Sequence, residues 1–159
     1  VTVAAARAAV AMREEEGRNL RADLEARLEA VSTALEAIVD RAPARLTEER
    51  DRLRRAIAEL AGDAGLDDDR IAREIAMIAD RWDISEEIVR LRSHIDHFRG
   101  MLDEAAAEPV GKRLSFLVQE MHREANTIGS KANDAEIEHA VVAIKNEIER
   151  LREQVENVE

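Results

Sequence analysis

Two stretches of this 159-residue chain carry polar side chains whose types and spacing could do chemistry. In the first, residues 83–98, Glu87, Arg90 and His94 recur three and four residues apart, so they share one face of a helix. A carboxylate and an imidazole on one face can hold a divalent cation or act as a general acid and base. A ladder of ion pairs on a solvated face has the same spacing, so both interpretations stay open.

The second stretch, residues 111–131, mixes amides, hydroxyls and charges. On a helix, one face presents five of these side chains: Glu120, Arg123, Glu124, Thr127 and Lys131. Carboxylates can hold a cation while Arg or Lys neutralises phosphate oxygens, which is the combination that metal-assisted phosphoryl chemistry uses. A salt-bridge network buried between subunits uses the same side chains, and the residues alone do not choose between the two.

The formal charge of the chain is −11, from 24 Lys and Arg against 35 Asp and Glu. This charge argues against broad non-specific binding of a phosphate polymer, but not against a local basic groove or a bound cation. The chain has no cysteine, which excludes disulfides and thiolate metal sites. No apolar run approaches the roughly 18–20 residues of a membrane span and no secretory leader is visible, so we expect a cytoplasmic protein without a membrane partner.

The elements that must position these side chains are helices. The chain is rich in Ala, Leu, Ile, Val, Glu and Arg, the composition of long packed helices. A four/three spacing of apolar residues, typical of a packing seam, occurs near both ends of the chain. The seam residues are Leu20, Leu24, Leu28, Val31, Leu35 and Ile38, and then Ile137, Val141, Ile144, Ile148, Leu151, Val155 and Val158. We therefore predict an all-α fold of long antiparallel helices with coiled-coil-like packing, in which residues 1–159 form a single helical domain.

Proline and glycine set the expected boundaries. Pro43 is expected to end the first helix, so residues 1–60 are predicted to form a helical hairpin and residues 67–159 a helical core. Asp67 and the two aspartates after it are interpreted as helix caps rather than as a calcium loop. Two points stay open: whether the helix breaks near Asp83, and whether a later bend falls at Gly129 or at residues 133–134.

A long and specific string runs through the second stretch, Gln-Glu-x-x-Arg-Glu-x-Asn-Thr-x-x-Ser-Lys at residues 119–131. Together with residues 83–94 and 148–159, it resembles the YicC-like family of bacterial proteins, and the resemblance covers essentially the whole chain, the first hairpin only in character. The sequence departs from the family pattern at three positions. Ser115 stands where Asp is expected, His122 where Asn is expected, and Trp82 where a small residue is commoner. The first change removes a carboxylate from the candidate site, and the second adds a candidate ligand.

The resemblance implies a metal-dependent endoribonuclease that cuts single-stranded RNA in the bacterial cytoplasm and assembles as a ring-like hexamer. The implied cofactor is a divalent ion, Mn²⁺ or Mg²⁺. Family members carry an additional N-terminal domain with β structure, which we expect to be absent from these residues. The shortage of aromatic residues, two Phe and one Trp, argues against base stacking as the source of RNA affinity and favours contacts to the backbone and the metal.

Residue types combined with the resemblance give each candidate a role. The candidate cation ligands or acid–base groups are Glu87, His94, Glu120 and Glu124. The candidate phosphate contacts are Arg90, Arg123 and Lys131, and the side chains expected to orient the substrate or their neighbours are Gln119, Asn126 and Ser130. The alternative is a non-catalytic helical module for oligomerisation or interaction, with the same polar residues buried between subunits.

Overall fold

The computed structural model of the chain describes residues 2–61, 68–103 and 110–156. Over these ranges the backbone forms five helices and no strands: α1 (Thr2–Ala61), α2 (Asp68–Trp82), α3 (Ser85–Asp103), α4 (Gly111–Ala132) and α5 (Ala135–Val155). The all-α prediction is confirmed, whereas the coiled-coil detail of the packing stays a prediction. None of the described helices combines the length and the apolar character that a membrane crossing needs. Asp67 and Val158 lie outside the described residues.

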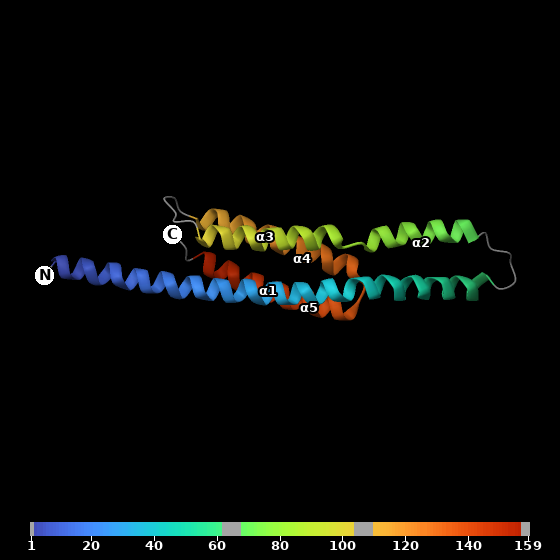
Figure 1. The fold of residues 1–159 in the computed structure, drawn as a ribbon, viewed down its shortest axis with the longest axis horizontal. Coiled ribbons are helices and arrows are strands. Elements are labelled where there is room, and N and C mark those ends of the chain that lie inside the picture. The colour runs from blue at the N-terminus through green and yellow to red at the C-terminus, as the bar shows by residue number, and fades with distance from the viewer. Residues whose placement is uncertain (1, 62–67, 104–109, 157–159) are drawn as a thin grey trace.

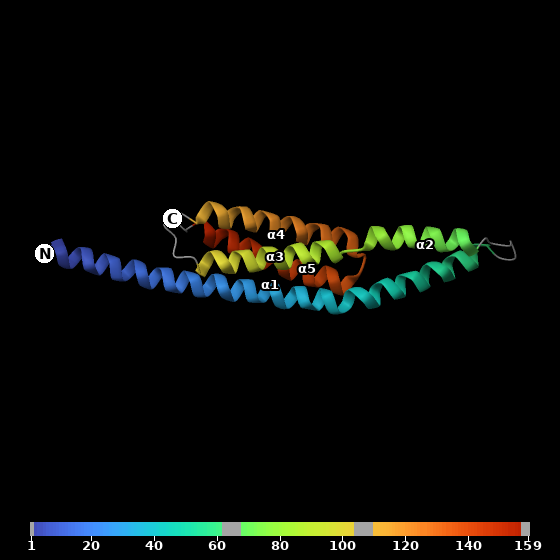
Figure 2. The same ribbon diagram turned by 45° about the horizontal axis from the view of Figure 1, so that its top comes forward.

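Four helices form an elongated bundle, in which α1, α3, α4 and α5 lie side by side (Figures 1 and 2). Each helix contacts two neighbours around the bundle, in the order α1, α3, α4, α5 and back to α1. α1 is much the longest element and extends past the bundle at both ends. Its N-terminal part projects alone with residues 3–19 exposed, and its far end runs beside α2.

The core follows the apolar seams that the sequence predicts. In α1 the spacing of four and three residues buries Leu24, Leu28, Val31, Leu35 and Ile38, while Leu20 is half-buried at the edge. The seam of α5 is buried from Ile137 to Val155 in the same way. Both patterns place one stripe of each helix toward the bundle axis, where burial of apolar surface stabilises the fold.

Pro43 does not end the first helix, so the predicted helical hairpin within residues 1–60 is wrong. A proline inside a helix removes one backbone hydrogen bond and crowds the carbonyl four residues earlier, at a cost of about 3 kcal/mol or more. α1 bends well past its middle, in the part coloured cyan in Figure 2, and Pro43 is exposed to solvent. Arg41 and Arg45, on either side of the proline, hold α1 to the rest of the bundle. The hairpin forms instead between the C-terminal end of α1 and α2.

The sequence left open whether the helix breaks near Asp83 and where the later bend falls. In the structure both breaks are short junctions between helices. α2 ends at Trp82 and α3 begins at Ser85, so the helix breaks at residues 83–84. The Asp83 carboxylate accepts hydrogen bonds from the hydroxyl and the backbone N–H of Ser85, which hold its pKa below the ordinary value. α4 runs through Gly129 and ends at Ala132, and the next residue, Asn133, caps it with a left-handed backbone at φ 45°. A Cβ at Gly129 would lie 3.2 Å from a methyl group of Val141, so glycine permits the close approach of α5.

Asp134 begins α5 and connects it to α1. Its carboxylate accepts hydrogen bonds from the Ile137 N–H at 3.0 Å and from the Arg41 guanidinium at 2.8 Å. Burial raises the pKa of Asp134, but the hydrogen bonds from Arg41 and the backbone outweigh burial and leave that pKa below its ordinary value. Asp134 is therefore both the cap of α5 and an ion-pair partner that requires the charged form.

We expect Asp134→Ala to lower the free energy of unfolding by about 1–2 kcal/mol near neutral pH, the typical cost of losing a helix cap. Because the folded state depresses the pKa of Asp134, this stabilisation is present above the unfolded-state value of about 3.9. It is lost as the pH falls through the lower folded-state pKa. Urea unfolding of both proteins at several pH values from 7 down to about 3 measures it. A deficit that does not shrink toward acid would contradict this account.

Candidate metal centre between two helices

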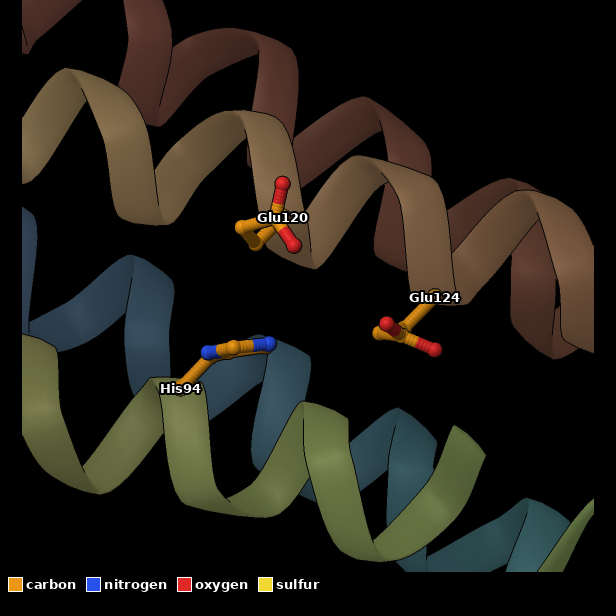
Figure 3. A group of neighbouring side chains, drawn as sticks. All are labelled: His94, Glu120 and Glu124. Atoms are coloured by element: carbon orange, nitrogen blue, oxygen red, sulfur yellow. The ribbon is translucent and has the colours of Figure 1, made fainter. Parts of the chain in front are cut away.

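The candidate site lies between the antiparallel helices α3 and α4. His94 comes from α3, while Glu120 and Glu124 come from one turn of α4, four residues apart. Figure 3 shows the three side chains pointing toward one another across the gap between the two helices. One potential ligand atom from each of them lies within 4.8 Å of the other two. The two stretches that the sequence singled out are therefore brought together by helix packing.

Burial makes this cluster different from acidic residues on an open surface. Glu124 is only 4% exposed, while His94 and Glu120 are half-buried. His94 Nδ1 is a buried nitrogen without a hydrogen-bond partner in the structure as described. A buried polar atom without a partner costs free energy, which a bound cation can offset. One imidazole and two carboxylates form a donor set that suits Mn²⁺ and related divalent ions.

Two arginines surround the cluster without saturating its carboxylates. Arg90 Nη1 lies 3.9 Å from Glu124 Oε1, and a second nitrogen of Arg90 is hydrogen-bonded to Glu86. Arg123 Nη1 lies 3.9 Å from Glu120 Oε2. Both arginine side chains are largely exposed, so their contacts with the carboxylates are weak and screened by solvent. The candidate phosphate-binding residues Arg90 and Arg123 therefore sit at the edge of the candidate metal centre.

Glu87 does not join this group. Its side chain is buried, and its Oε1 accepts a hydrogen bond at 2.7 Å from Lys131, which also donates to the Asp83 carbonyl. The second oxygen of Glu87, Oε2, is buried without a partner among the described atoms. The structure thus pairs Glu87, which we predicted to bind a cation, with Lys131, which we predicted to contact phosphate. We accordingly place Glu87 and Lys131 beside the candidate metal centre rather than in it.

The residues expected to orient the substrate are spread over the exposed side of α4. Gln119 lines a cavity of about 180 Å³ together with His122 and residues of α5. Asn126 is exposed and shares a hydrogen bond of 3.0 Å with His122 Nδ1. Ser130 is exposed and donates to the carbonyl of Thr127. His122, which the sequence suggested as an added ligand, therefore lies outside the group of three.

Sequence reasoning missed Arg45, a buried residue that connects the α2–α3 junction with the α4–α5 junction. Its guanidinium donates to the carbonyl of Ala132 at 2.6 Å and to that of Trp82 at 2.5 Å. These are the last carbonyls of α4 and α2, where the helix dipole favours a cation. Burial lowers the pKa of Arg45, but an arginine remains charged. Its spacing could have indicated that Arg45 is buried, because position 45 lies seven residues after Ile38 and continues the apolar seam of α1.

The fold and the site define a class of protein: a helical bundle with an imidazole and two carboxylates gathered between adjacent helices. Comparison with known proteins identifies the family. The family model described as "Endoribonuclease YicC-like, C-terminal" matches residues 38–159, which include α2 to α5 and the whole candidate site. The chain belongs to the YicC-like family, which confirms the resemblance.

Two relatives are similar over nearly all of this chain, and each is named "Probable endoribonuclease YicC". The protein from Clostridioides difficile (strain 630) is 39% identical over 149 residues, which is 93% of this chain and 50% of the relative. The protein from Haemophilus influenzae (strain ATCC 51907 / DSM 11121 / KW20 / Rd) is 34% identical over 150 residues, 94% of this chain and 51% of the relative. The chain thus spans about half the length of the curated relatives it matches.

Proposed function

We propose that this chain is the helical C-terminal part of a metal-dependent endoribonuclease that cleaves single-stranded RNA. The observation that carries the proposal is the convergence of His94, Glu120 and Glu124 within 4.8 Å. The names of the relatives support ribonuclease activity in the family. In the proposal, these three side chains hold Mn²⁺ or Mg²⁺. A bound divalent cation stabilises negative charge on a phosphodiester and lowers the pKa of water.

The chain's own residues have separate tasks in this proposal. Glu124, the most buried of the three, supplies a fixed negative charge, and His94 supplies a nitrogen that has no competing partner among the described residues. Glu120 is half-buried and lies nearer to solvent, so it is the carboxylate best placed to exchange a proton with the substrate. Arg90 and Arg123 are exposed beside the carboxylates and would contact the phosphate backbone.

Loss of Glu120 tests the proposal. We expect Glu120→Ala to slow cleavage of a single-stranded RNA with Mn²⁺ or Mg²⁺ by about 100-fold, since a stabilisation of roughly 3 kcal/mol is lost. Glu138→Ala, which removes an exposed glutamate on α5, serves as the matched control and keeps full activity. Gel analysis of the labelled RNA, with wild type and both variants at equal concentration, measures the rates.

Assembly must be measured on the same samples, because we also propose, from the family resemblance, that the protein assembles as a hexamer. Sizing of the wild type and of Glu120→Ala separates a chemical defect from dissociation of subunits. Slow cleavage by a variant of unchanged size supports a role for Glu120 in the reaction. Cleavage at the wild-type rate by Glu120→Ala would remove Glu120 from the site, and a wild type that cuts no RNA with either metal would refute the proposal.

A further inference from the structure

Phe116 is an aromatic side chain on the outside of the bundle. It is 60% exposed, whereas Phe98, the other phenylalanine, is fully buried at 0%. Around Phe116, α4 packs into the core through Leu114, Leu117 and Val118, so the ring of Phe116 is not needed for packing. It is the one large apolar side chain of α4 that is exposed within the described residues. A single exposed apolar side chain is common on protein surfaces, so the case for Phe116 depends on where the ring lies and on the charges around it.

The position of Phe116 connects it to the candidate metal centre. Phe116, Glu120, Arg123 and Thr127 follow one another at intervals of four, three and four residues, so they share one face of α4. At a rise of 1.5 Å per residue, the backbones of Phe116 and Glu120 lie about 6 Å apart along the helix axis. A molecule that contacts Glu120 from the solvent side therefore lies about one helical turn from Phe116.

The helix that carries the ring has a formal charge opposite in sign to that of the whole molecule. α4 carries four Lys or Arg residues against two Glu, and it is the one helix among the five described whose formal charge is positive, while the chain carries −11. Lys112 and Arg123 are both exposed, one turn before and two turns after Phe116. A polyanion is thus attracted along α4 but repelled by the molecule as a whole.

We propose that Phe116 is a stacking platform for one base of a single-stranded RNA whose backbone follows the positive face of α4 toward Glu120. The identity of the ligand rests on the proposed function. A single strand fits because its bases are free to stack on an aromatic ring, which paired bases in a duplex are not. One exposed ring does not by itself make a protein interface, which takes roughly 800 Å² per partner, whereas a single ring suffices to stack one base. One well-placed ring thus supplies stacking despite the scarcity of aromatics.

The test compares an RNA that has bases with a ligand that lacks them. The probes are a fluorescein-labelled ten-nucleotide oligoadenylate and an abasic ribose-phosphate chain of the same length, both with EDTA to prevent cleavage. We expect Phe116→Ala and Phe116→Leu to weaken binding of the oligoadenylate about tenfold, since both remove the ring. Phe116→Tyr, which keeps the ring, and Val142→Ala, which shortens an exposed apolar residue of α5, bind it like the wild type. All five proteins bind the abasic chain equally.

Three results would overturn the inference: wild-type affinity for the oligoadenylate in Phe116→Leu, an equal loss for the abasic chain, or no binding of either probe by the wild type. A changed assembly size in Phe116→Ala with unchanged RNA affinity would likewise place the ring at a protein contact. Binding and cleavage measured together distinguish a failure of the proposed function from a failure of the stacking platform. Ring-dependent binding without cleavage in Mn²⁺ or Mg²⁺ would refute the nuclease alone, and cleavage that is indifferent to the ring would refute the stacking platform alone.

Discussion

Glu124→Gln is expected to weaken Mn²⁺ binding about 100-fold, the upper end of the loss seen when a supporting partner of a metal site is removed. Glu124 is 4% exposed, and its carboxylate faces both His94 and Glu120. Glutamine keeps the shape of the side chain but removes the negative charge that a hard cation requires. The fold should survive, because removal of a buried charge also removes its desolvation cost, and the nearby Arg90 is exposed enough to be solvated.

Electron paramagnetic resonance of free Mn²⁺, titrated with the wild type and with Glu124→Gln, measures the two affinities. The control is Glu138→Gln, which makes the same chemical change at an exposed position of α5. Urea unfolding of the three proteins separates a metal-binding defect from a folding defect. Equal Mn²⁺ affinity in Glu124→Gln and wild type would exclude Glu124 as a ligand, whatever its effect on RNA cleavage.

Arg45→Met is expected to lower the free energy of unfolding by about 3–5 kcal/mol, since hydrogen bonds to a charged donor contribute roughly 1.5–3 kcal/mol each. Arg45 is 4% exposed and donates to the last carbonyls of two helices, at 2.6 Å to Ala132 and 2.5 Å to Trp82. Methionine fills much of the volume but leaves both carbonyls without their donor. The ends of α2 and α4 would then lose the cation that balances their helix dipoles.

The matched control for Arg45 is Arg50→Met in the same helix. Arg50 is exposed and its guanidinium is hydrogen-bonded to the neighbouring Asp51, so its loss should change stability by less than about 0.5 kcal/mol. Chemical denaturation of the two variants gives the comparison. A cost of under about 1 kcal/mol for Arg45→Met would mean that water replaces the guanidinium and that Arg45 does not connect the two junctions.

The apolar seams were predictable from the sequence because each depends on spacing within one helix. Leu24 to Ile38 and Ile137 to Val155 are buried as that spacing requires. Pro43 was misread because helix propensity is a local quantity, whereas α1 continues through the proline with the support of distant contacts. Arg41 reaches Asp134, 93 positions away in the chain, and Arg45 reaches Ala132, 87 positions away. No local pattern reveals such partners.

The sequence indicated the individual residues of the candidate site, but not which of them lie together in space. Glu87, His94, Glu120 and Glu124 were named from their types together with the family resemblance, and the structure brings the last three together. The register between α3 and α4 depends on how two helices pack, which spacing within either helix cannot supply. That register pairs Lys131 with Glu87 at 2.7 Å and so takes both away from the group of three.

The negative charge of the chain is unevenly distributed among its helices, which changes what it implies for RNA binding. At −11 the chain as a whole repels RNA, yet α4 is positive and borders the candidate metal centre. A cation held by two carboxylates adds further positive charge at the same place. An RNA strand would therefore be attracted along one helix only, which restricts where on the protein it can bind.

Crystals of the chain grown or soaked with Mn²⁺, with anomalous data collected near the manganese absorption edge, test the central claim most directly. The account predicts one strong anomalous peak between α3 and α4, within coordination distance of a nitrogen of His94 and of oxygens of Glu120 and Glu124. The same peak should vanish in Glu124→Gln. A saturating Mn²⁺ concentration that leaves this position without a peak, or places the ion elsewhere, would contradict the account.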